Sequence, residues 1–254
     1  MKNKNVFKSL LVILIVLALW YTVSKIGIFS SFVFPSPERV FNTFVTMLKS
    51  GELIQNTVAS FYRVILGFII SFILAFILGI VACLFPKAEP YYKPILEFLR
   101  HIPPMSLIPL LILWSGIGET SKIIVIVLTS FFPIFMNTRS GLINADEKLI
   151  EVGKTLHMSK SQIFFSIRLP YALPNILVGA RIGLGYSLRA IIGAEMIAAA
   201  SGLGYMILDA QSLSRIDKVM VGIIMIGILG LLIDGLFNLV IKKFVTWKEV
   251  SDEW

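Results

Sequence analysis

The sequence predicts an all-α membrane protein with six transmembrane helices and a cytoplasmic helix-turn-helix between the fourth and fifth. Of its 254 residues, 57% are hydrophobic and only 15% are charged, and the mean hydropathy is +0.87. An ordinary soluble domain is about 25% charged, so this chain needs an apolar surrounding. The single cysteine, Cys83, excludes a disulfide framework and a multi-cysteine metal site.

The first predicted span, residues 10–28, is apolar apart from Lys25. A spanning helix needs about 20 mostly apolar residues. Lys2, Lys4 and Lys8 precede this run, as in a signal peptide, but no small-residue cleavage site follows it. We therefore expect the first span to remain uncleaved.

The second and third spans differ in regularity. Residues 64–85 carry no charge, whereas residues 102–118 are uncharged but contain Pro103, Pro104 and Pro109. Because proline lacks the backbone donor of a helix and kinks it, the third span is expected to be short and broken at its start.

The last three spans are expected at residues 123–138, 172–200 and 219–241. The chain is predicted to be one transmembrane domain, residues 1–254, without a soluble domain or internal repeat. Its core covers about residues 55–240.

Charges inside the last two spans are candidate functional groups. The fifth span contains Arg181, Arg189 and Glu195, and the sixth contains Asp234. A charge in mid-bilayer is costly unless it is paired or faces water. Arg189 or Arg181 could offer positive charge to a passing anion. Alternatively, these residues could form internal ion pairs, for example with Asp234 or Glu195.

The 23 lysines and arginines predict the orientation. Six spans place both termini on one side of the membrane. That side holds fourteen of them: Lys2, Lys4, Lys8, Lys87, Lys93, Arg100, Arg139, Lys148, Lys154, Lys160, Arg168, Lys242, Lys243 and Lys248. The opposite side holds six: Lys25, Arg39, Lys49, Lys122, Arg215 and Lys218. Three lie within spans: Arg63, Arg181 and Arg189.

The positive-inside rule then places both termini and the loops 86–101 and 139–170 in the cytoplasm. Because topology accounts for the formal net charge of +8, no nucleic-acid partner is needed to explain it.

The 139–170 loop predicts a first short helix. Asn144 is a plausible N-cap, and Glu147 lies three residues later, as in a capping box. Three apolar residues then fall on one face at helical spacing: Leu149, Val152 and Leu156.

A second short helix follows in the same loop. Ser159 and Gln162 form another capping-box pair before the run 163–167. Pro170 disfavours helical backbone at Leu169, so the helix is expected to end there.

The loop could pack against the inner ends of its own spans. It is, however, much longer than the 2–8 residues usual between bundle helices, and an apolar face outside the bilayer favours docking of a partner protein. Gly153-Lys154-Thr155 has the ending of a phosphate-binding loop, but position 148 is lysine where that motif needs glycine. No nucleotide site is therefore predicted on this chain.

This loop resembles the signature of the membrane permease subunits of bacterial ABC importers. That signature reads Glu-Ala-Ala, three residues, Gly, nine residues, Ile-x-Leu-Pro. The spacing matches from residue 151 to residue 170. Four residues match in identity: Glu151, Ile167, Leu169 and Pro170. Three positions depart from the pattern, since Val152 and Gly153 replace the alanines and His157 replaces the glycine.

Two further segments resemble the nitrate, taurine and alkanesulfonate branch of these type I importers. They are residues 102–123, IPPMSLIPLLILWSGIGETSKI, and residues 194–207, AEMIAAASGLGYMI. Related permeases import thiamine or riboflavin precursors or aromatic acids, so such cargo remains an alternative.

The resemblance implies a mechanism and a set of partners. Two permease chains, expected as a homodimer in the bacterial inner membrane, would form the path for a small anion. An external substrate-binding protein or lipoprotein would deliver it. Two ABC ATPase subunits would bind ATP and dock on the coupling loop, about residues 144–170. Its implied docking residues are Glu151, Val152, Gly153, Leu156, His157, Ile167, Leu169 and Pro170. No cofactor or metal is then expected on this chain.

Two other classes of protein compete with this hypothesis. A membrane enzyme would need a catalytic motif, and the sequence contains no HExxH, GxSxG or clustered His/Asp set. A secondary transporter or channel would need inverted repeats or a coupling-ion site. We therefore expect a transport subunit that is not an enzyme.

Overall fold

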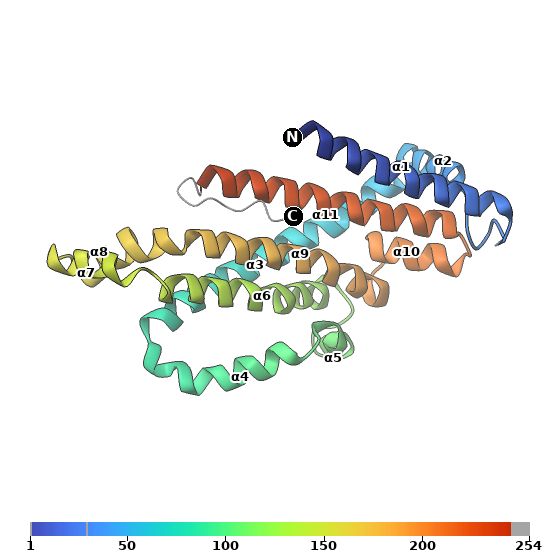
Figure 1. Ribbon diagram of the computed structural model, residues 1–254. Coiled ribbons are helices and arrows are strands. Elements are labelled where there is room, and N and C mark those ends of the chain that lie inside the picture. The colour runs from blue at the N-terminus through green and yellow to red at the C-terminus, as the bar shows by residue number, and fades with distance from the viewer. Residues whose placement is uncertain (1, 29, 245–254) are drawn as a thin grey trace.

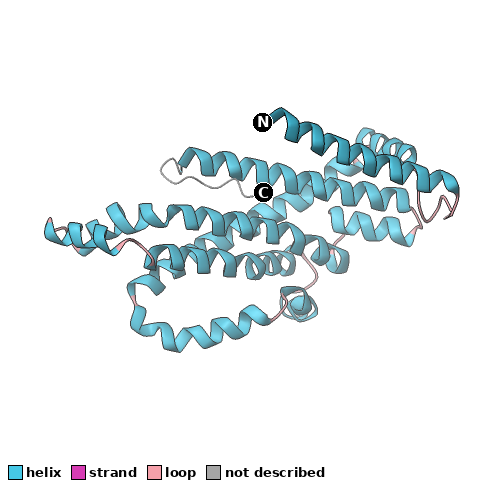
Figure 2. Cartoon of the chain, viewed as in Figure 1, coloured by secondary structure: helices cyan, strands magenta, loops and turns pink. Residues whose placement is uncertain are grey.

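The structure is a computed structural model that describes residues 2–28 and 30–244. Helices make up nearly all of this part of the chain, and no strand occurs in it (Figure 2). The α-helices are α1 Lys2–Ile26, α2 Pro37–Lys49, α3 Glu52–Leu84, α4 Glu89–His101, α5 Ile108–Ser115, α6 Glu119–Ile143, α7 Glu147–Thr155, α8 Lys160–Ile163, α9 Leu169–Ala198, α10 Leu203–Ser212 and α11 Ile216–Phe244. Short 3₁₀ turns cover Pro86–Ala88 and Pro104–Leu107, and a π turn covers Phe164–Arg168.

Helices α3, α6 and α9 form the centre of the molecule (Figure 1). Helix α6 packs along both of the others. Glycines allow the close approach of α9, since a Cβ at Gly179 would lie 2.6 Å from Cβ of Asn137 and one at Gly183 would lie 2.8 Å from the Ile134 side chain. Small residues of this kind let helices approach closely inside a membrane.

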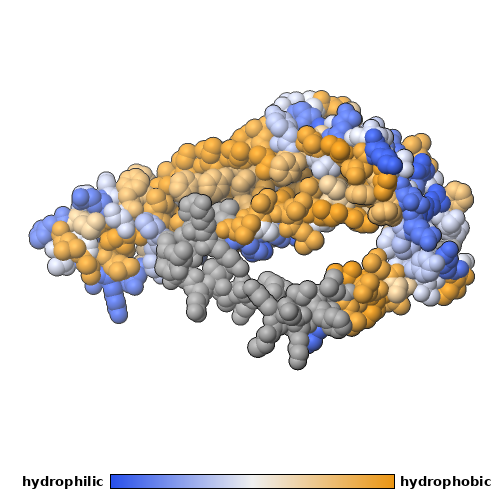
Figure 3. Space-filling model, turned by 90° about the horizontal axis from the view of Figure 1, so that it is seen from above, coloured by the Kyte–Doolittle hydropathy of each residue, from blue (hydrophilic) through white to orange (hydrophobic). Residues whose placement is uncertain are grey.

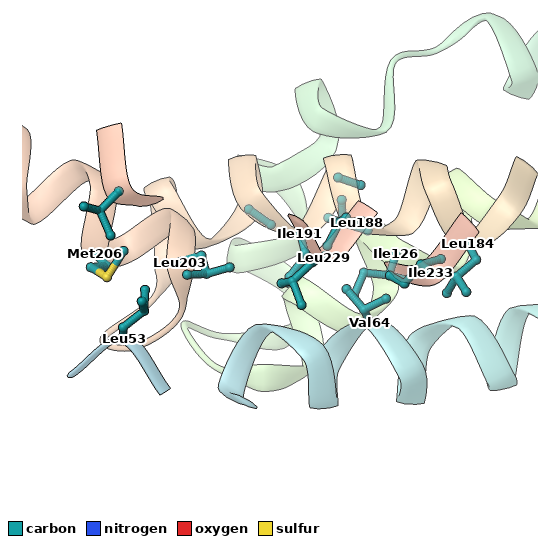
Figure 4. Close-up of a cluster of buried hydrophobic side chains, with 14 of the residues drawn as sticks. Leu53, Val64, Ile126, Leu184, Leu188, Ile191, Leu203, Met206, Leu229 and Ile233 are labelled. Carbon is teal, nitrogen blue, oxygen red and sulfur yellow. The ribbon is translucent and has the colours of Figure 1, made fainter. Parts of the chain in front are cut away.

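A buried apolar cluster joins this centre to α10 and α11. Figure 4 shows side chains of α3, α6, α9, α10 and α11 meeting in it. Val64, Ile126 and Ile191 are fully buried there. Many other large apolar side chains lie on the outside, such as Leu231, which is 76% exposed. Hydrophobic residues cover the middle of the molecule, and hydrophilic residues gather toward its two ends (Figure 3). A bilayer can cover such a middle region.

Four helices are long and apolar enough to cross a membrane: α3, α6, the continuous helix Lys160–Ala198 and residues Ile216–Leu239 of α11. The helices on either side of residues 102–103 are bent by 85° and make a fifth span if counted together. The predicted break at Pro103 and Pro104 is confirmed. Residues 86–101, expected as a loop, are largely helix α4. The shorter apolar stretch Leu11–Ile26 lies within α1.

The α10 end of the molecule is held together by an ion pair network around Asp217. The Asp217 carboxylate is buried and accepts hydrogen bonds from Thr43 of α2 at 2.8 Å and from Arg215 at 2.8 Å. The hydrogen bond to Asp217 raises the pKa of the Arg215 guanidinium, which lies outside α11. Lys218 donates to Glu52 at 2.8 Å and so ties α11 to α3.

Candidate functional site

The segment between α6 and α9 contains the helix-turn-helix that the sequence predicts, with a different first cap. Asp146 is the N-cap of α7, and its carboxylate accepts a hydrogen bond from the Lys148 N–H at 2.9 Å. The prediction that Asn144 is this cap is wrong. Asn144 instead ends α6, because its own N–H still bonds to the Ser140 carbonyl at 3.0 Å.

The turn between α7 and α8 places His157 in left-handed backbone, with a φ of 57°. The N–H of Met158 bonds to the Gly153 carbonyl at 3.0 Å, and that of His157 bonds to Lys154 at 2.9 Å. These two bonds make the Schellman ending of a helix, whose left-handed residue is usually glycine. Histidine therefore occupies a position at which glycine would be less strained.

The second helix begins as predicted but does not end as predicted. The capping box is present, because Gln162 N–H donates to Ser159 Oγ at 3.3 Å and Ser159 N–H donates to Gln162 Oε1 at 2.8 Å. The expectation that Pro170 ends the helix is wrong, since the chain stays helical from Lys160 to Ala198. The wider π turn at 164–168 precedes Pro170, and a π turn adds one residue to a helix and changes its bonding. Leu169 keeps helical backbone, and Pro170 falls in the first turn of α9, where a missing N–H is tolerated.

The two sides of α7 have different surroundings. On the inner side Ile150 and Ile163 are buried against Met158 and Ile167. A Cβ at Gly153 would lie 2.9 Å from Ile167 Cδ1, so the small residue at 153 brings α7 close to the next helix. These contacts fix α7 against the base of α9.

The outer side of α7 leaves an apolar groove unfilled. Leu149, Val152 and Leu156 are 47%, 55% and 69% exposed. They line a groove of about 570 Å³ together with Gly153, Met158, Ser166, Ile167, Pro170, Tyr171 and Pro174. Of the other residues that the resemblance singles out, Glu151 and His157 are exposed, and Leu169 is half-buried. We call this surface the coupling groove.

Two of the predicted charges in the spans pair with each other. Arg181 Nε on α9 donates to Asp234 Oδ1 on α11 at 3.0 Å, and their side chains are 39% and 53% exposed. This contact is one of the internal ion pairs that the sequence left open.

Arg189 has a different environment. It is exposed, and its guanidinium carbon lies 5.7 Å from the centre of the Tyr186 ring. Within the described residues no carboxylate pairs with it. Both residues line a pocket of about 270 Å³ with Pro104, Met105 and Thr129. Arg189 is thus a cation at a pocket, with an aromatic ring as its neighbour.

Sequence reasoning missed a cluster of four charges around Glu195, of which three are buried and the fourth, Glu119, is 55% exposed. The Glu195 side chain is fully buried and accepts a hydrogen bond from Arg63 Nη1 at 2.8 Å. The same guanidinium donates to both carboxylate oxygens of Glu119, at 2.6 and 2.9 Å. Lys122, also buried, donates to Glu119 at 2.7 Å. These residues, the four-charge cluster, join α3, α6 and α9.

The four-charge cluster also holds the start of α10. Glu195 accepts a hydrogen bond from the Gly204 N–H at 3.0 Å, and Ser60 Oγ accepts one from the Leu203 N–H at 2.8 Å. The Asn56 side chain accepts one from the Gly202 N–H at 2.8 Å. Because the N-terminus of a helix attracts an anion, Glu195 acts here as a cap for α10. A role for Glu195 in the path stays a prediction.

Only weak signals in the sequence pointed to this cluster. Arg63 was visible as an arginine inside a span, and Glu119 lies in the resembling segment 102–123. Neither position indicates its partner. Within the described residues, no group of three or more His, Cys, Asp or Glu side chains is arranged to hold a metal ion.

Comparison with known proteins identifies the family. Residues 75–246 match the model of the binding-protein-dependent transport system inner membrane component. The chain is 38% identical over 247 residues to a putative aliphatic sulfonates transport permease protein of Bacillus subtilis (strain 168), covering 97% of this chain and 90% of that protein. It is 32% identical over 250 residues to the taurine transport system permease protein of Escherichia coli (strain K12), covering 96% and 91%.

A solved structure of the MetNI methionine ABC transporter, in an inward-facing conformation, has a chain with the same fold. The TM-score is 0.61 at 18% identity, over 72% of this chain and 94% of that chain. This likeness shows the fold; the matched family model and the two relatives show that the chain belongs to the family of inner-membrane components of binding-protein-dependent transport systems.

Proposed function

We propose that the chain is the permease subunit of an ATP-driven importer and crosses the bacterial inner membrane six times. Four long apolar helices, the bent pair around residues 102–103 and the apolar stretch Leu11–Ile26 supply six candidate crossings. The excess of lysine and arginine on one side favours an orientation with both termini in the cytoplasm. Lys248, which contributes to this excess, lies outside the described residues.

The coupling groove is the observation that carries this proposal. It lies at the α7 end, which the orientation puts in the cytoplasm, and its apolar residues are exposed on a rigid helix. An unfilled apolar surface outside the bilayer is typical of a protein-binding site. We propose that an ABC ATPase subunit, which binds the ATP, inserts an apolar segment there. The complex would hold two ATPases and two copies of this chain as a homodimer, with an external binding protein on the opposite face.

A single charge in the coupling groove should abolish ATPase binding. In Leu149→Glu or Val152→Glu, the carboxylate would have to be buried against the partner without a counter-charge, which costs several kcal/mol. Co-purification of the co-expressed ATPase subunit should fall at least tenfold, and ATP-driven uptake should fall with it. Thr155→Glu is the matched control, because it adds the same charge to an exposed position of α7 outside the groove. Normal co-purification by the groove variants would contradict the docking proposal.

We further propose a small anion of the sulfonate, taurine or nitrate class as the cargo. The names of the two relatives, which are permeases for aliphatic sulfonates and for taurine, favour this class. Arg189 supports it physically, since its charge is exposed at a pocket beside Tyr186 without a carboxylate partner among the described residues. A guanidinium binds oxyanions through charge-assisted hydrogen bonds.

Arg189→Gln should therefore lower uptake about tenfold or more, since a hydrogen bond to a charged group contributes about 1.5–3 kcal/mol. The measurement is uptake of labelled taurine or an alkanesulfonate by vesicles that contain the complete transporter. Arg181→Gln on the same helix is the control, because that charge is already paired with Asp234. If Arg189→Gln transports normally, or if it only lowers the amount of protein in the membrane, a role of Arg189 in the path is wrong.

A further inference from the structure

Helix α4 runs beside α6 (Figure 1). Residues of these helices and of the end of α3 line two neighbouring pockets. The charged pocket, of about 280 Å³, lies between α4 and α6 and contains Lys93, Arg100 and Arg139. The apolar pocket, of about 270 Å³, lies between the end of α3 and α4. Both pockets share Tyr92, Leu96 and Phe135, so those side chains separate them.

The charged pocket has more hydrogen-bond donors than acceptors. Glu89 forms an ion pair with Arg139, whose Nη2 lies 2.5 Å from its carboxylate, and lies 3.7 Å from Lys93 Nζ. Glu97 is the other carboxylate in the lining, which leaves three cations to two anions. Arg100 Nη1 lies 3.1 Å from the thioether sulfur of Met136, a weak acceptor.

Two buried polar atoms in this lining have no hydrogen-bond partner among the described residues. They are Arg139 Nε and the Tyr92 hydroxyl. Buried polar groups are almost always satisfied in folded proteins. An oxyanion in the charged pocket would accept hydrogen bonds from such donors and would balance the excess cation.

The apolar pocket indicates what the oxyanion is attached to. Apart from the Tyr92 hydroxyl, its lining consists of hydrocarbon side chains such as Val81, Phe85 and Ile95. A freely soluble anion would have no apolar part to contact this lining. An amphiphile would fill both pockets at once, with its charged group beside Arg100 and its chain beyond Leu96.

The position along the spans fits a lipid headgroup. Helix α3 ends at Leu84, and Arg139 lies four residues before the end of α6, so the charged pocket lies where hydrocarbon meets water. Basic pockets between helices at the cytoplasmic surface bind anionic lipid headgroups. We propose that α4 and α6 form a binding site for an anionic phospholipid of the cytoplasmic leaflet, with its phosphate in the charged pocket and one acyl chain in the apolar pocket.

The test measures lipid retention by the purified full transporter. Delipidated complex is titrated with phosphatidylglycerol or with phosphatidylcholine of the same chains, and bound lipid is counted by native mass spectrometry. We expect phosphatidylglycerol to be preferred, and Arg100→Gln and Lys93→Gln each to reduce that preference about fivefold. Both side chains are at the surface, so these variants should fold. Lys148→Gln on α7 removes an exposed cation elsewhere and should leave the preference unchanged.

A second variant tests the acyl-chain pocket. Ala88→Trp would fill the apolar pocket and should reduce retention of phosphatidylglycerol while ATPase co-purification persists. Three outcomes would overturn the proposal: equal retention of the two lipids, an unchanged preference in Arg100→Gln and Lys93→Gln, or displacement of bound lipid by inorganic phosphate at millimolar concentration. The last outcome would mean that the pocket takes a free anion.

Discussion

Replacing Arg63 by methionine should lower the free energy of unfolding by about 3–5 kcal/mol, the usual cost of removing one partner from a buried ion pair. Glu195 is fully buried and would lose its counter-charge, while Glu119 would lose both of its hydrogen bonds to Arg63. Thermal unfolding of the purified protein in detergent measures the effect.

Arg39→Met provides the matched control. Arg39 is partly exposed and lies 3.9 Å from Asp217, which keeps its shorter contact with Arg215. Because the Arg39 side chain is 38% exposed and the buried Asp217 carboxylate keeps Arg215 as its partner, losing this long contact should cost about 1 kcal/mol or less. Adding Glu195→Gln to Arg63→Met removes the unpaired charge and should recover part of the loss. Equal melting temperatures for Arg63→Met and Arg39→Met would show that the four-charge cluster does not hold the helices together.

Gly204→Ala should be the second severe change, with a loss of about 3 kcal/mol or more in the free energy of unfolding. A Cβ at this position would lie 2.1 Å from the carbonyl oxygen of Ile192 and 2.8 Å from Cβ of Glu195. The Ile192 carbonyl belongs to the backbone of α9, so α10 would have to move away. That movement would also break the hydrogen bond from the Gly204 N–H to Glu195.

Gly227→Ala is the control, because it replaces a helical glycine by alanine without causing a clash. Gly227 lies inside α11, and a Cβ there would have no neighbour within 4 Å. Alanine is about 1 kcal/mol more favourable than glycine within a helix, so this variant should be as stable as the original protein or more so. If both variants melt at the same temperature, α10 does not pack closely against α9.

Local features of this chain could be predicted from its sequence. The uncharged run 64–85 is enough to predict the apolar part of α3, because a helix satisfies its own backbone hydrogen bonds in a bilayer, but it does not indicate that the helix begins at Glu52. The Ser159–Gln162 capping box needs only residues three apart, and it is present as expected. The break at Pro103 and Pro104 likewise follows from the chemistry of one residue type.

Other local rules failed where two of them competed. Asn144 and Asp146 are both good N-caps, and the sequence does not tell that α6 extends to Ile143 and takes Asn144 as its end. Pro170 should disfavour helix at Leu169, yet the helix runs on through the π turn and Pro170 into α9. Hydrophobic periodicity does not indicate such a turn.

The partners of the intramembrane charges could not be predicted, because they are distant in the chain. Arg63 is 56 residues from Glu119 and 132 from Glu195. The sequence offered Asp234 and Glu195 as partners for Arg181 or Arg189, and only the packing of α9 decides among them. Arg181 pairs with Asp234, and Glu195 pairs with Arg63.

The unbroken helix from Lys160 to Ala198 has a mechanical consequence. Its 39 residues measure about 58 Å at 1.5 Å per residue, enough to reach from the base of the coupling groove to the four-charge cluster. A stiff rod of this length turns a tilt of about 10° at one end into a shift of about 10 Å at the other. Force applied at α8 would therefore strain the contacts of Glu195, with the π turn and Pro174 as the interruptions of regular helical bonding between them in the described residues.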